Sequence, residues 1–309
     1  MTTEGNVSEG AKIEVNGVPV EDTFAEAFDM KATRVIITAH SMQWARDAAT
    51  AFTGFATSVI ACGVEMGVEC ELSPEQTPDR RPGVAVLAFA VSGKELEKQI
   101  PRRAGQCVLT CPTTALFAGM EGEKKIPMGK TLRFFGDGYQ ISKRIAGRRY
   151  WRIPVMDGEF LCEETTARTD AIGGGNFLLL GRSLEQVSIA CRAAVAAMAS
   201  LPGIITPFPG GATRSGSKVG SKYAALFAST NQAYCPSLAG LVSQPFGEEV
   251  KAIMEVVIDG VLPEQIAESM KVGITAACVT VGAEGLAGVT AGNYGGKLGR
   301  HHFRLHEVL

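Results

Sequence analysis

The sequence lacks the charge and the apolar segments that a nucleic-acid or membrane protein needs. Its 30 Lys and Arg stand against 32 Asp and Glu, so no basic field is available to attract nucleic acid or anionic lipid. The start, MTTEGNVSEG, has neither the basic residues nor the apolar core of a secretory signal. No uncharged run is long enough to span a membrane. We therefore expect a globular, cytoplasmic metabolic protein without nucleic-acid or membrane partners.

Histidine is scarce, and cysteine is not arranged to hold a metal. There are four histidines, three of them in the C-terminal segment HHFRLHEVL, and eight cysteines scattered mostly in apolar runs such as VSIACRAAV. Cysteine in such runs behaves as a small buried hydrophobic residue. Cys107 and Cys111 in CVLTC have neither a second pair nor a neighbouring histidine, so the ligand spacing of a zinc site is missing. We expect no metal site.

What the chain does have is a long polar loop between Pro207 and Pro236, PFPGGATRSGSKVGSKYAALFASTNQAYCP. Compact domains seldom keep such loops without a use, although a Gly- and Ser-rich loop can also be a plain connection. Its lysines, hydroxyls and amide suit an anionic, amide-rich ligand. We expect the substrate-binding residues to be Gly210, Gly211, Ser217, Lys218, Ser221, Lys222, Asn231, Tyr234 and, from the later glycine-rich segment AGNYGGKLG, Asn293.

Those glycine runs do not predict a nucleotide site. The Rossmann pattern needs a strand before the glycines and a helix after them, whereas GGGNF at 173–177 leads into an apolar strand candidate. We expect the glycines to allow close approach of the backbone to a flat or extended ligand.

A single carboxylate, Glu255, interrupts the apolar run EEVKAIMEVVIDG. Alternation predicts a strand whose core face carries Val250, Ala252, Met254, Val256 and Ile258. Glu255 then lies on the opposite face. If that face meets solvent, Glu255 is an ordinary edge carboxylate. If the face is covered, desolvation raises the pKa of Glu255, and the residue can move protons near neutral pH.

The two halves repeat one order of elements. SLEQVSIACRAAVAAMASLPG stands in the place of SMQWARDAATAFTG, and EEVKAIMEVVIDG in that of RPGVAVLAFAVSG. Each half is predicted to run strand, helix, strand, strand, helix, strand, which is the order of the ferredoxin-like sandwich. The predicted fold class is α+β, with two ferredoxin-like (split βαβ) lobes related by internal duplication. We place the lobes at 1–157 and 158–309, with most of the active site in the second.

Individual elements follow from local patterns. Residues 13–30 are predicted to form a short strand and a short helix, after a disordered start. A helix is predicted between Ser41 and Gly54, because these residues suit a helix N-cap and a helix stop. Further predicted helices are 93–100, 183–203 and 262–278. The predicted strands are 33–40, 55–63, 84–91, 107–110, 130–140, 173–182, 203–208, 248–260 and 297–309.

Seven motifs occur in one order: NGVPVEDTFAEAF, RFFGDGYQ, GGNF, PFPGG, SKVGSKY, ASTN-x-AYCP and AGN-[FY]-GGKLG. From about Ile13 to Leu309 the chain resembles the formylmethanofuran:tetrahydromethanopterin formyltransferase family. The resemblance implies an enzyme without a bound prosthetic group, which moves a formyl group between N5 of tetrahydromethanopterin and the amine of methanofuran. It also implies a homotetramer with its active site at a subunit contact, and it makes Glu255 the counterpart of the catalytic glutamate.

The near-neutral charge and the added N-terminus resemble the methylotrophic bacterial branch of that family. There the transferase is one subunit of a formyltransferase/hydrolase complex, and the formyl group leaves as formate. Two alternatives remain at this point. The chain could be a non-catalytic carrier-binding or scaffold subunit of such a complex, or the transfer could pass through a covalent intermediate on Cys235.

Overall fold

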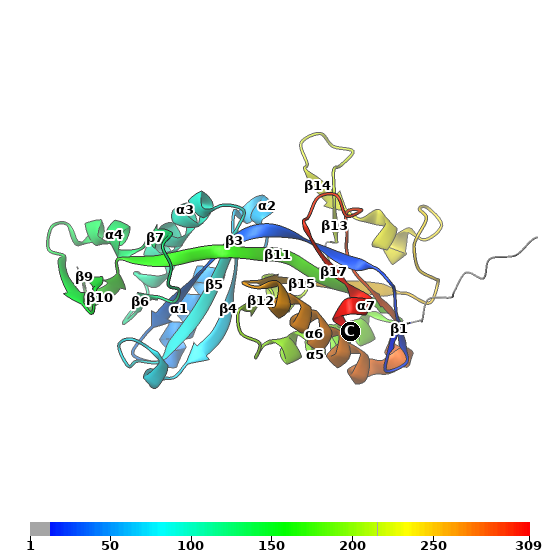
Figure 1. The fold of residues 1–309 in the computed structure, drawn as a ribbon, viewed down its shortest axis with the longest axis horizontal. Helices are drawn as coiled ribbons and strands as arrows, with labels where there is room; N and C mark the ends of the chain where they lie inside the picture. Colours follow the sequence, from blue (N-terminus) through cyan, green and yellow to red (C-terminus); the bar gives the residue numbers. More distant parts are fainter. Residues whose placement is uncertain (1–12, 215) are drawn as a thin grey trace, which may run out of the picture.

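A computed structural model describes residues 13–214 and 216–309. The chain is mixed α+β and is built on one large sheet of 15 strands, with a separate two-stranded hairpin of β13 and β14. Two strands, β3 (Phe24–Thr38) and β11 (Thr165–Gly181), run side by side along the length of the molecule, and helices cover the sheet in two groups near its two ends (Figure 1).

The first half, from residue 13 onward, supplies the elements up to β9. The strands are β1 (Ile13–Val15), β2 (Val18–Val20), β3, β4 (Glu65–Leu72), β5 (Gly83–Ala90), β6 (Ala115–Ala118), β7 (Lys125–Pro127), β8 (Ile141–Ile145) and β9 (Arg148–Val155). The helices are α1 (Met42–Thr53), α2 (Val59–Cys62), α3 (Gly93–Arg103) and α4 (Gly129–Leu132).

The second half supplies the remaining elements. The strands are β10 (Gly158–Glu163), β11, β12 (Ile204–Ile205), β13 (Ser217–Val219), β14 (Ala228–Thr230), β15 (Ala252–Gly260), β16 (Leu286–Thr290) and β17 (His301–Arg304). The helices are α5 (Leu184–Met198), α6 (Pro263–Gly285) and α7 (Leu305–Val308).

The strands of each half pair in the same spatial order. In the first half β6 pairs with β3, β3 with β5, and β5 with β4, all antiparallel. In the second half β16 pairs with β11, β11 with β15, and β15 with β12, again antiparallel. The halves are joined where residues 28–33 of β3 pair with residues 168–173 of β11.

The helices predicted between Ser41 and Gly54 and at 93–100, 183–203 and 262–278 are confirmed as α1, α3, α5 and α6. Ser41 accepts a hydrogen bond from the Trp44 amide at the start of α1, and Gly54 ends that helix. Ser92 and Ser183 cap α3 and α5 in the same way. The hydroxyl of each N-cap satisfies one of the amide groups that a helix start leaves without an intrahelical partner.

The short helix predicted within residues 13–30 is wrong. This segment forms the β1–β2 hairpin and the first half of β3. Its composition, FAEAFDM, favours a helix, but residues 24–27 pair with β17 and residues 28–33 pair with β11. Backbone pairing with distant strands therefore overrides the weak local propensity.

Five predicted strands also fail wholly or in part. Of residues 203–208, only Ile204–Ile205 form a strand. Residues 55–63 contain the short helix α2, whose first amides bond to the Ser58 hydroxyl and the Glu65 carboxylate. Residues 107–110 continue the α3 region as a π-helical turn, and residues 130–140 form α4 and a 3-10 turn. Residues 297–309 contain only the short strand β17 before α7. Short apolar runs do not distinguish strand from helix.

Two core clusters lie under the two groups of helices, and each takes residues from both halves of the chain. The first-half residues Val18, Val20 and Ala25 lie in the cluster of α5 and α6. Phe160 and Cys162, from the second half, lie in the cluster of α1 and α3. Each half therefore contributes a segment to the core of the other.

Helix α6 is long and apolar enough, by length and composition, to cross a membrane, and one of its faces packs in the second cluster. Its residues Ile266, Met270 and Ile274 pack there with Val187 and Ala190 of α5. These contacts make it the core helix of a globular fold.

A pair of buried carboxyl groups sits where the two halves meet. Asp259 in β15 is fully buried and accepts a hydrogen bond from the Gly174 amide at 3.1 Å. Glu65 in β4 accepts one from the Val59 amide at 2.9 Å. Burial, and next the nearby Glu65 carboxyl, raise the pKa of Asp259 well above its ordinary range. Burial also raises the pKa of Glu65.

This pair gives a prediction for stability against pH. Because the pKa of Asp259 is raised in the folded state, the folded chain holds a proton that the unfolded chain releases. The contribution of this bound proton to the free energy of unfolding is complete below the pKa that Asp259 has in the unfolded chain. It is lost as the pH rises through the pKa that Asp259 has in the folded chain. The side chain in Asp259→Asn cannot ionise, so the variant does not lose this contribution. From about pH 5 to about pH 8, the difference in free energy of unfolding between the variant and the natural chain should therefore change in favour of the variant. Urea unfolding at both pH values measures this.

The matched control is Asp170→Asn. Asp170 is exposed and pairs with Lys31 at 2.7 Å, and this contact lowers its pKa. Its titration is therefore finished before pH 5 is reached, and the control should show no alkaline gain. An equal gain in both variants would mean that the buried pair does not cause the effect.

Candidate functional site

Glu255 lies in β15 with its backbone held on both sides. It is the cross-strand partner of Leu178 in β11, and on the other side its N–H and C=O exchange hydrogen bonds of 2.9 and 2.8 Å with Thr213. The predicted alternation is confirmed for this part of the strand, since Val256 and Ile258 lie in the second core cluster and Ala252 and Met254 pack against it. The Glu255 side chain therefore faces away from α5 and α6.

A small cavity of about 30 Å³ adjoins the Glu255 side chain, large enough for a group the size of a water molecule. Part of its lining comes from the strands, with Leu178, Ile253 and Glu255. The rest comes from the polar loop and consists of Thr213, Arg214, Gly216, Asn231, Tyr234 and Cys235. The loop thus covers the face of the sheet that carries Glu255.

Desolvation under this loop raises the pKa of Glu255 to about 7. Near neutral pH the carboxyl group is then present in both protonation states, so that one side chain can accept a proton and later return it. The nearby tyrosines are affected too. Burial raises the pKa of Tyr294, and the charges of Glu255 and Glu26 raise it further.

Of the predicted binding residues, Asn231 and Tyr234 line the cavity with Glu255. Gly210 and Gly211 form the turn Pro209–Gly211 just before Thr213. Asn293 holds its own loop, since its side chain donates to the Thr23 hydroxyl and the Phe24 carbonyl and accepts from the Gly295 amide.

The remaining predicted residues lie in the β13–β14 hairpin and its tip, outside the cavity lining. Ser217 pairs with Thr230, and the Lys218 ammonium group donates to the Gln232 side chain. Ser221 accepts a hydrogen bond from the Tyr223 amide, and Lys222 is exposed.

Sequence reasoning did not select Thr213, Arg214, Tyr294 or Glu26 as site residues. Arg214 stands in the polar loop, where its charge was a usable signal. Glu26 gave none, because its segment resembled a helix.

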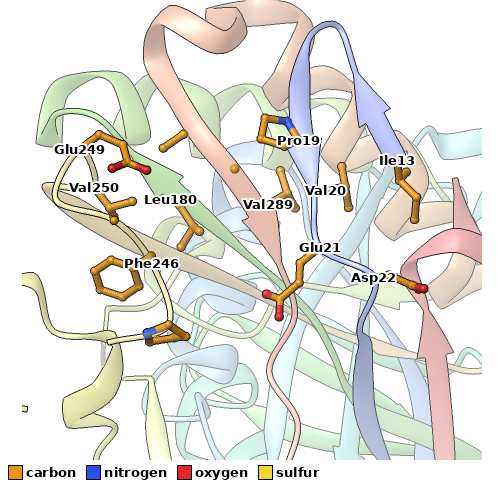
Figure 2. A pocket seen from close by; sticks show the side chains of 14 residues that line it. Ile13, Pro19, Val20, Glu21, Asp22, Leu180, Phe246, Glu249, Val250 and Val289 are labelled. Carbon is orange, nitrogen blue, oxygen red and sulfur yellow. The ribbon is translucent and has the colours of Figure 1, made fainter. Parts of the chain in front are cut away.

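A larger cleft of about 610 Å³ opens beside the site, between the β1–β2 hairpin, the end of β16 and residues 245–250 (Figure 2). Carboxylates and apolar side chains share its wall, including Glu21, Glu249, Val20 and Phe246. The Phe246 ring lies 6.1 Å from the Tyr234 ring, between centroids. Tyr234 therefore stands between the cleft and the cavity at Glu255.

Within residues 13–214 and 216–309, no three His, Cys, Asp or Glu side chains gather as metal ligands. Cys235 is a free thiol whose sulfur donates to the Asn231 carbonyl at 3.5 Å. No histidine occurs among the described residues that line the cavity with it.

Comparison with known proteins gives a consistent result over the whole described chain. A family model described as formylmethanofuran-tetrahydromethanopterin formyltransferase matches residues 13–155, and one described as FTR, proximal lobe, matches residues 158–308. The chain is 65% identical over 306 residues to a Rhodopirellula baltica protein named formylmethanofuran--tetrahydromethanopterin formyltransferase, with 94% of this chain and 92% of that protein covered.

A Methylorubrum extorquens protein, named as a subunit of the formyltransferase/hydrolase complex, is 52% identical, with 96% of this chain and 97% of that protein covered. A crystal structure of the Methylorubrum extorquens complex with methylofuran contains a similar chain, with a TM-score of 0.94 and 51% identity over 97% of this chain and 99% of that one. The formyltransferase structure from Methanosarcina barkeri has a TM-score of 0.91 and 48% identity over 96% of this chain and 100% of that one.

The turn before Thr213 gives a second prediction. Gly210 and Gly211 both have positive φ, 68° and 79°. A Cβ on Gly210 would meet nothing within 4 Å, whereas one on Gly211 would lie 2.5 Å from Cγ1 of Val195 in α5. Gly210→Ala should cost about 1 kcal/mol of unfolding free energy through backbone strain alone. Gly211→Ala should cost about 2 to 4 kcal/mol, because overpacking adds to the strain.

Chemical denaturation of the two variants measures the difference, and each serves as the control for the other. Equal costs, or a larger cost at Gly210, would contradict the packing of this turn against α5.

Proposed function

Because the chain belongs to the formylmethanofuran-tetrahydromethanopterin formyltransferase family, we propose that it transfers a formyl group between N5 of tetrahydromethanopterin and the primary amine of a methanofuran-type carrier. The observation that carries this proposal is the desolvated carboxyl of Glu255, whose pKa of about 7 suits proton transfer at neutral pH. Both one-carbon carriers are substrates, and no bound cofactor is required.

The proposed reaction is direct acyl transfer. The carrier amine attacks the formyl carbon, a C–N bond forms, and the carbonyl electron pair moves to oxygen. Glu255 accepts the proton that the attacking amine loses. When the tetrahedral intermediate collapses, the bond to the pterin N5 breaks and Glu255 returns a proton to that nitrogen. A single acid/base residue can serve both steps, because the two nitrogens exchange at one carbon and the proton that one loses is the proton that the other gains.

The oxyanion needs a hydrogen-bond donor, and one such donor contributes about 3 to 4 kcal/mol. Lys218 is not suited to this role, because its ammonium group is bonded to Gln232 and lies outside the cavity lining. Arg214 and the side-chain amide of Asn231 belong to that lining. We propose these two as the donors.

The two alternatives are less well supported. A scaffold subunit has no use for a desolvated carboxyl beside a cavity. A covalent formyl-cysteine needs an activated thiol at Cys235, and the cavity lining described here holds no histidine to activate it.

We also propose that the two halves are ferredoxin-like lobes related by duplication, with the boundary between residues 157 and 158. Support comes from the equal strand order in both halves and from the two family models, which match residues 13–155 and 158–308.

The Methylorubrum extorquens relative supports a bacterial role. The Methylorubrum protein is named a subunit of a formyltransferase/hydrolase complex, and the structure of that complex holds methylofuran. We propose that this chain likewise works in the cytoplasm with hydrolase subunits. Formyl groups then pass from the pterin to the carrier and leave as formate.

The third prediction tests Glu255 directly. Glu255→Gln is nearly isosteric and should fold, but turnover should fall at least about a hundredfold, which is the lower range for a general acid/base. The measurement is formyl exchange between formyl-tetrahydromethanopterin and methanofuran with the purified chain.

Cys235→Ser is the matched control, because it changes another side chain of the same cavity. The control should keep its turnover. Near-natural turnover of Glu255→Gln would remove Glu255 from the mechanism, and a trapped thioester at Cys235 would establish the covalent route.

The fourth prediction concerns assembly. Between α4 and β9, the side chains of Phe134, Phe135, Tyr139 and Ile141 are more than half exposed. Apolar surface of this kind is rarely left to solvent on a monomer. We propose a closed homotetramer built from dimers, and Phe135→Glu should lower its mass in sedimentation at assay concentration. The control is Val91→Glu, a change at an exposed valine elsewhere on the surface. A fully active monomer of the natural chain would refute the assembly.

A further inference from the structure

The carboxylate of Glu26 in β3 is fully buried, yet four backbone amides surround it. One oxygen accepts hydrogen bonds from the amides of Leu298 and Gly299, both at 2.6 Å. The other accepts from Tyr294 at 2.6 Å and Gly296 at 2.8 Å. Burial acts to raise the pKa of Glu26, but the four amides together lower it below its ordinary value. Glu26 is therefore a permanent anion at neutral pH.

The amides belong to the segment 291–300, which joins β16 to β17 and which we name the closing loop. Its glycines allow the amides to converge on one point. Gly295 and Gly296 have φ of 81° and 70°, and a Cβ on Gly299 would lie 2.3 Å from the Ala27 carbonyl oxygen. Successive amides in such a conformation form an anion-binding concavity. Here the anion is a side chain of the protein itself.

The closing loop starts two strands away from Glu255, across β11. Thr290, the last residue of β16, pairs with Leu178, and Leu178 pairs on its other side with Glu255. Directly paired residues point to the same face of a sheet, as do residues two apart on one strand. Asn176, two residues before Leu178, bonds to both the amide and the carbonyl of Gly292. The loop is thus fixed on the face from which Glu255 projects.

Tyr294 is bound to one carboxylate and is influenced by the charge of the other. Its amide bonds to Glu26, and its ring lies 5.9 Å from the Phe28 ring. The charge of Glu255 raises the pKa of its phenol group. The other ionisable groups near Glu255 are Arg214, Tyr234 and Cys235 of the polar loop, which cover it from the opposite direction.

We propose that Glu26 is a positioning residue for formyl transfer: by gathering the amides of residues 294–299, it holds Tyr294 over the sheet face beside Glu255 and keeps water from that carboxyl group. The inference rests on the proposed function of Glu255 as the acid/base. Glu26 itself touches neither substrate nor reacting atoms.

The test compares Glu26→Gln and Tyr294→Ala with the natural chain by two measurements. The first is the titration of the Glu255 carboxyl carbon, followed by ¹³C NMR with labelled glutamate and assigned through Glu255→Gln. The second is the pH profile of formyl transfer. The Gln side chain turns an NH₂ group toward amides that themselves donate, so it should release the loop. Tyr294→Ala removes the ring to which the proposal assigns the covering of Glu255.

In both variants the midpoint of Glu255 should fall from about 7 toward the ordinary value of about 4.3. The corresponding limb of the pH profile should move with it. Turnover near neutral pH should drop about tenfold to a hundredfold while KM changes less than about threefold, as expected for a displaced group outside the binding contacts.

Glu163→Gln is the control for a merely structural role. Glu163 is also a buried carboxylate, and it accepts a hydrogen bond from the Ala118 amide at 3.0 Å. It lies at the end of β10, next to Cys162 of the core cluster of α1 and α3. Its replacement should lower stability and leave the Glu255 midpoint unchanged.

An unchanged Glu255 midpoint in Tyr294→Ala would overturn the proposal, and so would an equal shift in Glu163→Gln. If Glu26→Gln does not fold, Tyr294→Ala still decides the question. If the natural chain transfers no formyl group, the proposed function fails, but the NMR midpoints still test the positioning of Glu255 by themselves.

Discussion

The antiparallel pairing of β3 with β11 is the contact on which the rest of the structure depends. Six residue pairs, from Phe28 and Gly173 to Thr33 and Arg168, join the strands of the two halves into one sheet. Each strand then continues beyond this contact, and β3 reaches β17 while β11 reaches β15 and β16. Because the strands are shared, neither half can be removed without stripping residues from the core of the other.

Because β3 pairs with β11, Glu26 of β3 and Glu255 of β15 both lie near the closing loop, but their environments differ. Glu26 is surrounded by amide donors, which favour its charged form, whereas desolvation favours the neutral form of Glu255. One carboxylate is thereby suited to hold structure and the other to move protons. The Tyr294 amide donates a hydrogen bond to Glu26, and the charge of Glu255 raises the pKa of the Tyr294 phenol.

The polar loop after β12 contributes by covering rather than by presenting charge. Its turn at Pro209–Gly211 leads to Thr213, which bonds to the backbone of Glu255, and its later residues Asn231 and Tyr234 complete the cavity. Its hairpin satisfies its own polar groups, for example Lys218 with Gln232. The long insertion into an otherwise regular strand order therefore contributes to the desolvation of Glu255.

The sequence by itself determined the features whose causes are local. The serine cap at Ser41 predicted the start of α1, and alternation predicted that Glu255 lies on the face opposite the core. Tertiary structure decided what depends on distant partners. The helix-like segment at 24–30 is a strand because β11 and β17 pair with it, and Glu26 binds amides more than 260 residues away. Of the predicted loop residues, contacts across the fold brought only Asn231 and Tyr234 to the cavity lining. The hydrogen-bond partners and the burial of a residue depend on chain segments that are distant in the sequence. Local patterns contain no information about these segments, and for this reason the sequence alone predicted the helix start and the strand face but not the site contacts.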